Sequence, residues 1–220
     1  MNSSSTPATQ TASTVPTEDG LRLLREIAAS GLLRCAVPTE LGGLPGTHND
    51  LAEGGMHLAR TDRAAAGILW AQRSAIEALV QSRNVALMEY LLPDLLAGDR
   101  AGSMAVAAQP LIGRDTGRGW LLDGALDDVP NLQSTGCSIV APVQLQAQLA
   151  WVLLRSEEDG LQIGLAVEKR MPPALCTAAL HARGVFFRED EYLGGQDLLE
   201  RMAPLTSALA LARCSVSRKG

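Results

Sequence analysis

The chain has 220 residues, of which 46% are hydrophobic and only 3% aromatic, so it can bury a core made mostly of Leu, Ala, Val and Ile. Its formal net charge of -5 argues against a nucleic-acid or anionic-membrane partner. No apolar run reaches the roughly 18 residues of a membrane span. The N-terminus lacks the basic and apolar regions of a secretory signal, so we expect a cytoplasmic protein without a membrane partner.

The first hundred residues predict a tail followed by helices. Residues 1–17 are almost wholly Ser, Thr, Ala, Pro, Gln and Asn, a composition typical of disorder. Apolar residues then recur at helical spacing from Leu21, and Gly31 is a natural stop. Asp62 is placed to cap a later helix, and Pro93 to start a short turn. The helices are expected at residues 21–29, 49–60, 64–79 and 84–92.

After Gly102 the pattern changes to short strand-like runs separated by Gly, Pro, Asp and Asn. The phrase SEEDG, residues 156–160, is a hairpin turn signal. Helical spacing returns at residues 196–217, where Pro204 predicts a kink or a helix start. The strand-like runs are residues 103–110, 119–130, 137–145, 149–156, 161–167 and 182–190.

These elements predict an α+β fold in which a helical domain precedes a small antiparallel β-barrel or sandwich and a terminal helix. The expected parts are a disordered tail at 1–17, a helical domain at 18–101, a β domain at 102–195 and a terminal helix at 196–220. The cysteines are too widely spaced to hold a metal, so we expect free thiols and no metal site. They are Cys35, Cys137, Cys176 and Cys214.

An early glycine-rich loop resembles a known family. Residues 31–43, GLLRCAVPTELGG, match the phrase GL-x-x-x-x-VP-x-E-x-GG of the acyl-CoA dehydrogenase superfamily. Three later phrases extend the resemblance in the same order, namely LLPDLLAGDRAGSMAVAAQP, GWLLDGALDDVPNLQSTGCSIVAPV and ARGVFFREDEYLGG. The resemblance covers the chain from about residue 21 to its end and implies the fold of that superfamily, with the loop bordering an acyl pocket.

The resemblance also implies FAD, and it places the flavin contacts at positions where this sequence departs from the family. Ala107 to Pro110 stand where the family has Leu-Thr-Glu-Pro, and Gly113, Arg114 and Asp115 stand where it has Gly-Ser-Asp. Asp128, Val129 and Pro130 stand where it has Trp-Ile-Thr, and Pro130 has no N–H to donate. The expected cofactor-binding residues are Ala108, Gln109, Arg114, Val129 and Pro130.

The sequence leaves the catalytic base unknown. The carboxylates and histidines weighed for this role are expected to be solvated or structural side chains. They are Glu53, Glu77, Glu189, Asp190, Glu191, His48, His57 and His181. The phrase GRDTGRG, residues 113–119, is consistent with phosphate binding through Arg114 or with a plain hairpin turn. The three tryptophans are expected to fill the core.

The resemblance implies an oxidoreductase that acts on the CH–CH group of an acyl thioester, such as an acyl-CoA, with FAD as hydride acceptor. One alternative is a degenerate member that only binds acyl-CoA or a partner protein, and a second is a flavin-dependent monooxygenase. Family members continue into a four-helix bundle where this sequence ends. We therefore expect a homo-oligomer or a companion subunit, with an interface at Leu198, Leu205 and Leu209.

Overall fold

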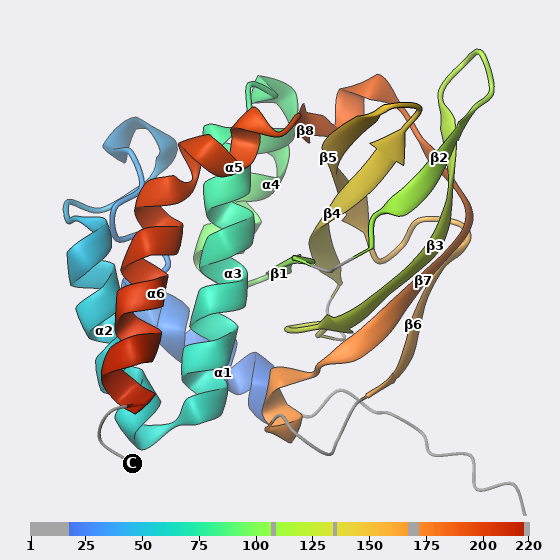
Figure 1. The fold of residues 1–220 in the computed structure, drawn as a ribbon. Coiled ribbons are helices and arrows are strands. Elements are labelled where there is room, and N and C mark those ends of the chain that lie inside the picture. The colour runs from blue at the N-terminus through green and yellow to red at the C-terminus, as the bar shows by residue number, and fades with distance from the viewer. Residues whose placement is uncertain (1–17, 107–108, 134–135, 167–171, 218–220) are drawn as a thin grey trace, which may run out of the picture.

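The computed structural model describes residues 18–106, 109–133, 136–166 and 172–217 (Figure 1). A layer of helices lies beside a mixed β-sheet, and the last helix returns from the sheet to the helical layer (Figure 1). This arrangement confirms the predicted α+β fold. The predicted tail at residues 1–17 lies outside the described residues. The helices are α1 (Glu18–Ala29), α2 (His48–Thr61), α3 (Arg63–Gln81), α4 (Val85–Ala97), α5 (Asp197–Arg201) and α6 (Ala203–Ser217).

Side chains at two helix starts explain where the helices begin. Thr47 accepts a hydrogen bond from the backbone N–H of Asp50, whose carboxylate accepts one from the Thr47 N–H, so the pair forms a capping box for α2. Asp62 accepts hydrogen bonds from two N–H groups in the first turn of α3. The cap predicted at Asp62 is therefore confirmed.

Helix α4 is longer than its sequence suggests, because it continues through Pro93 to a left-handed cap at Gly98. Proline inside a helix removes one hydrogen bond and costs about 3 kcal/mol. The residues beyond it offset this cost, since Leu95 and Leu96 are buried in the core. Pro93 itself is exposed, so its ring crowds no neighbouring element. The predicted turn at Pro93 is therefore wrong, because burial of Leu95 and Leu96 favours continuation of the helix.

The sheet contains parallel as well as antiparallel pairs, and its described strands do not close into a barrel, which corrects this detail of the expected antiparallel barrel or sandwich. β1 and β2 both pair in parallel with β4, one after the other along the same strand. The strand order is β6-β7-β3-β2-β4-β5-β8, with β1 beside β4, and the described residues give no pairing between β6 and β8. The strands are β1 (Ala101–Met104), β2 (Leu111–Asp115), β3 (Trp120–Val129), β4 (Cys137–Leu145), β5 (Gln148–Arg155), β6 (Leu161–Ala166), β7 (Ala178–Phe187) and β8 (Tyr192–Gly194).

Two predicted turns have different outcomes. Residues 156–160 do form a turn between β5 and β6, but these strands do not pair, because β5 pairs with β4 and β8 while β6 pairs with β7. The predicted hairpin is therefore wrong. The phrase at 113–119 forms the end of β2 and the hairpin turn into antiparallel β3, the plainer of its two interpretations.

The C-terminal helices cover the helical layer of this same chain. α6 packs on α2 and α3, and α5 packs on α3 (Figure 1). Leu198 and Leu205 are fully buried, and Leu209 is partly buried against the core. The expected subunit interface at these leucines is wrong, because the chain itself covers them. Pro204 lies in the first turn of α6, which matches the predicted helix start.

The core is continuous from the helices to the sheet. Trp151 is buried, and Trp70 and Trp120 pack partly buried against core residues, as expected. Burial raises the pKa of the Cys137 thiol to about 11, so this cysteine is an unreactive core residue. The thiols whose side chains are described are all free. Among the described helices, none has the combined length and apolarity needed to cross a membrane.

The early loop needs glycine at position 43 for a steric reason. A Cβ atom added to Gly43 would lie 1.9 Å from the backbone oxygen of Val37. We therefore expect Gly43→Ala to lower the free energy of unfolding by about 1–3 kcal/mol, measured by urea denaturation. Gly195→Ala is the control, because the added Cβ would meet nothing closer than 3.4 Å, and its effect should stay within about 0.5 kcal/mol. Equal effects of the two changes would contradict this account.

Candidate functional site

A buried amide network joins α3 to the start of the sheet. The Nε2 group of Gln72 donates to the backbone oxygens of Leu95 and Arg100 at 2.8 and 2.9 Å. Its Oε1 atom accepts from the Gly102 N–H at 2.6 Å and from Asn131 Nδ2 at 3.0 Å. Both side chains are fully buried. Four hydrogen bonds therefore fix the position of β1 against α3 and α4.

Asn131 brings the end of β3 to β1. It follows β3 by two residues, and its Nδ2 atom donates to the Gly102 oxygen at 2.9 Å. At the other end, Asp123 of β3 pairs with Ile112 of β2. The next residue, Gly124, lies against Leu111, since a Cβ atom added to Gly124 would be 3.5 Å from the Leu111 Cα. Residues 125–130 therefore lie between the same two junctions as residues 103–106 and 109–110. We call these described residues the β1–β3 edge.

One side of the β3 backbone at the β1–β3 edge has no strand partner among the described residues. The pairing of β3 with β2 ends at Asp123, so beyond it β3 has only β7 as a strand partner among the described residues. Asp128 and Asn131 have positive φ angles of 54° and 59°, a conformation that Asp and Asn tolerate better than other side chains. Such residues concentrate at functional sites, which makes this edge a candidate site.

Exposed and unpaired groups also gather at the β1–β3 edge. Val106 is 75% exposed where β1 ends. The Ser103 hydroxyl on β1 is buried and has no hydrogen-bond partner within the described ranges. The same holds for the hydroxyl of Thr177, which precedes the β7 residue that pairs with Val129. Buried polar groups are normally hydrogen-bonded, so two unpaired hydroxyls beneath this part of the surface are unusual.

The structure places part of the predicted cofactor site here. Val129 is fully buried, its backbone included, and Pro130 is half-buried beside it. Gln109 is exposed just before β2. These three predicted residues belong to the β1–β3 edge, whereas Ala108 lies outside the described residues.

Arg114 lies elsewhere on the sheet. It pairs with Leu121 across the β2–β3 hairpin and is exposed. Leu121 and Val129 are eight residues apart along β3, or about 26 Å at roughly 3.3 Å per residue. Arg114 is therefore not part of the β1–β3 edge.

A separate group of buried ionisable residues lies under the early loop. Arg73 on α3 is fully buried, and its Nη1 atom donates to the Leu33 oxygen at 3.0 Å. Its Nη2 atom lies 3.6 Å from Glu77 Oε2, and His48 Nε2 lies 3.6 Å from the same oxygen. Burial lowers the pKa of Arg73, and the Glu77 carboxylate opposes this effect. This cluster joins the loop to α3.

The remaining candidate bases do not form a free catalytic group in the described ranges. Glu77 accepts from Gln81 Nε2 at 2.9 Å in addition to its ionic contacts. Glu53 and His57 are exposed on α2, and His181 is half-buried on β7. Glu191 faces Arg155, and burial is the main cause that raises the pKa of its carboxyl group. Glu189 and Asp190 are exposed in the adjoining 3₁₀ turn (Glu189–Glu191), where Asp190 pairs with Arg188.

The chain resembles several solved flavoprotein structures. The acyl-CoA dehydrogenase of Bacillus anthracis complexed with FAD superposes with a TM-score of 0.76 at 16% identity, over 88% of this chain and 36% of that one. The FAD complex of PigA gives 0.76 at 16% identity, over 90% and 57%. Glutaryl-CoA dehydrogenase from Mycobacterium smegmatis gives 0.74 at 16% identity, over 88% and 54%.

The chain has the acyl-CoA dehydrogenase fold. Identities this low carry the comparison no further than the fold, and the chain spans between 36% and 57% of the length of these three structures. No protein-family model and no curated sequence matches it. The fold expected from the order of the four sequence phrases is therefore confirmed by structure, although sequence comparison alone does not detect it.

Sequence reasoning missed the residues that shape the candidate site. Gln72 and Asn131 fix β1 and the end of β3, but neither carries a catalytic motif. The one available signal was the Pro130–Asn131 pair after a strand, since both residue types favour turns. The buried hydroxyls of Ser103 and Thr177 gave no signal at all, because their burial depends on the tertiary fold.

Proposed function

We propose that the chain binds FAD, with its flavin ring at the β1–β3 edge, and acts as an acyl-CoA dehydrogenase-like oxidoreductase on an acyl thioester. The observation that carries the proposal is the open strand edge of residues 125–130, in a fold shared with proteins solved as FAD complexes. The sheet leaves this backbone free to meet a planar ring that has hydrogen-bonding groups along one side.

The residues present fit such a ring. Exposed Val106 offers an apolar contact. Pro130, beside the buried Val129, would contribute its backbone carbonyl, and Gln109 an exposed amide. When bound, the flavin would supply the acceptor for the hydride that leaves the β-carbon of the acyl group. Protein groups would hold the thioester beside it and exclude water.

Charge adds a constraint on the cofactor's orientation. Asp127 and Asp128 are exposed at the β1–β3 edge, so the anionic phosphates of FAD should extend away from them. Arg114 remains a proposed phosphate contact at a distance from the ring. Expected ligands are an acyl-CoA or a related thioester, and a homo-oligomer or companion subunit remains part of the proposal, without the leucines first assigned to its interface.

A second candidate function is binding of acyl-CoA or a partner without catalysis. The observation that favours it is the state of the carboxylates, since Glu77 is held in a buried ionic cluster and Glu53 is exposed. Removal of a proton α to a thioester requires a positioned base. A third interpretation, flavin-dependent monooxygenation, has no specific structural observation in its favour.

Titration with FAD tests the proposal. We expect a shifted visible spectrum on binding, and bleaching near 450 nm when an acyl-CoA is added without oxygen. Val106→Asp should abolish binding, because it places a charge at the ring contact while changing an exposed residue. Val85→Asp, at a residue that is 57% exposed at the start of α4, is the matched control and should bind normally.

Each outcome separates the candidate functions. FAD binding with bleaching supports the dehydrogenase. FAD binding without bleaching supports a non-catalytic flavoprotein, and oxygen consumption that depends on reduced flavin would support the monooxygenase. Absence of FAD binding by the folded wild-type chain would contradict the proposal. Equal binding by the two aspartate variants would contradict the position of the ring.

A further inference from the structure

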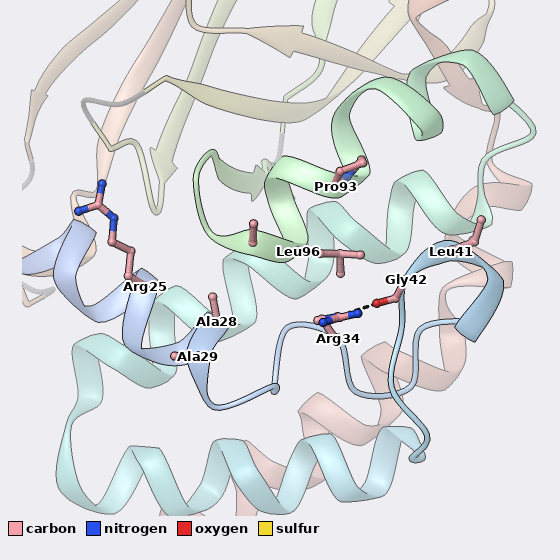
Figure 2. Close-up of a pocket in the computed structure, with 9 residues that line it drawn as sticks. Arg25, Ala28, Ala29, Arg34, Leu41, Gly42, Pro93 and Leu96 are labelled. Carbon is pink, nitrogen blue, oxygen red and sulfur yellow. Dashed lines mark hydrogen bonds between the residues drawn. The ribbon is translucent and has the colours of Figure 1, made fainter.

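The early loop forms a groove with α1 and α4 that the proposed function does not use. The groove has a volume of about 530 Å³ and lies between the end of α1, the loop at Arg34 and Gly42, and the second half of α4 (Figure 2). This volume is within the range of small-molecule sites in proteins, about 300–1,000 Å³. None of these lining residues belongs to the β1–β3 edge, so the groove is a separate feature.

Close contacts between the surrounding elements fix the groove's shape. Gly98 follows α4 and meets α1 so closely that an added Cβ would lie 3.0 Å from the Cβ of Ala28. On the opposite side, a Cβ on Gly42 would lie 3.7 Å from the Leu96 side chain. The apolar part of the lining comes from Ala28, Ala29, Leu41, Pro93, Leu96 and Ala97.

Two arginines give the groove its charge. Arg34 donates from Nε to the Gly42 oxygen at 2.6 Å, a bond that holds the guanidinium across the loop (Figure 2). No other described group hydrogen-bonds this guanidinium, so its two terminal nitrogens are free to bind a ligand. Arg25 has no ion pair or hydrogen bond within the described residues, whereas Arg22 on the same helix lies between Asp19 and Glu26.

No described residue that lines the groove is acidic, so its two cations are not neutralised there. A guanidinium with free terminal nitrogens binds carboxylate and phosphate oxygens well. The apolar lining beside it is suited to a short hydrocarbon chain. We propose that this groove binds an amphiphilic anion, with a carboxylate or phosphate head at Arg34 and a short apolar tail along Leu96 and Ala28, towards Arg25 at the other end of the groove (Figure 2).

Sodium octanoate is the first probe, and binding is followed by amide NMR shifts. We expect saturable shifts at Ala28, Gly42 and Ala97, with a dissociation constant on the order of millimolar. Octyl phosphate should bind to the same residues, and 1-octanol should bind more weakly because it lacks the charge. A stronger response to octyl phosphate than to octanoate would identify phosphate as the preferred head.

Variants distinguish a built site from general charge attraction. Arg34→Met should weaken octanoate binding by about threefold to fivefold, the range for an exposed charge pair. Arg25→Met should have a smaller effect, because Arg25 lies at the other end of the groove (Figure 2). Ala97→Phe should abolish binding by filling the groove without removing a charge. Arg60→Met is the matched control, because Arg60 is exposed on α2 away from the groove, and it should bind as the wild type does.

Arg34→Met removes the bond to Gly42, so Arg34→Lys and Ala97→Phe are needed to separate binding from loop stability. Arg34→Lys should retain part of the binding. Shifts confined to Val106 and Val129 would mean that octanoate uses the β1–β3 edge, and this would overturn the proposal. Absence of saturable shifts in a folded wild-type chain would also overturn it, because the arginines would then only offset the two helix C-termini nearby. FAD titration of the same samples reports the proposed function independently.

Discussion

Replacement of Glu77 by leucine is expected to lower the free energy of unfolding by about 3–5 kcal/mol. The change leaves the fully buried Arg73 guanidinium without its nearby carboxylate. Burial already lowers the pKa of Arg73, so the structure holds this charge in an unfavourable environment that Glu77 partly offsets. Urea denaturation at neutral pH measures the loss. Glu53→Leu is the control, because that carboxylate is exposed on α2, and it should change stability by no more than about 0.5 kcal/mol.

A double variant shows whether the effect comes from an unpaired charge. In the Arg73→Met, Glu77→Leu protein no buried charge is left unpaired between these positions, so most of the lost stability should return. The coupling free energy between the two substitutions should then exceed about 2 kcal/mol. A double variant as unstable as the sum of its single variants would contradict this explanation, and would mean that the loop depends on the Leu33 contact of Arg73 rather than on charge.

The sequence predicts the helices well because their signals are local. Asp62 caps α3 through its own side chain, and the prediction depends on neighbouring residues alone. The continuation of α4 through Pro93 could not be predicted in this way, since it depends on Leu95 and Leu96 meeting a core formed by distant segments. At this position, tertiary packing outweighs the low helix propensity of proline.

Strand partners were less predictable than strand positions. The runs at 137–145 and 182–190 contain strands, but nothing in them specifies that β4 takes both β1 and β2 as parallel partners. The turn at 156–160 has hairpin composition, yet its flanking strands pair with other partners. The partner of a strand depends on which other strands the tertiary fold brings beside it, and local composition does not encode this.

The candidate site was predicted in part, because family resemblance gives positions along the chain but not distances. Val129, Pro130 and Gln109 were assigned by matching phrases, and the fold brings them to one edge. Arg114 was assigned by the same method, but β2 begins at Leu111, so Arg114 becomes part of a strand that runs away from that edge. The groove at Arg34 could not be predicted, since it depends on α1 meeting α4 near Gly98.

Gln72→Leu should lower the free energy of unfolding by about 3 kcal/mol or more, since it removes four buried hydrogen bonds and leaves their partners unpaired. Amide exchange at Gly102 should accelerate in the variant, because its N–H bonds Gln72 directly. Gln162→Leu, at an exposed residue of β6, is the control and should stay within about 0.5 kcal/mol.

The same substitution tests the link between the helical layer and the candidate site. Gln72 bonds Asn131, and Asn131 holds the end of β3 at β1, so its loss should loosen the β1–β3 edge. FAD affinity, if the proposed function is correct, should then fall even at urea concentrations where the chain stays folded. If the Gln72→Leu variant is destabilised but binds FAD as tightly as the wild type, other contacts position Asn131. The strongest candidate is the 2.7 Å hydrogen bond from the Asn131 N–H to the Leu175 oxygen.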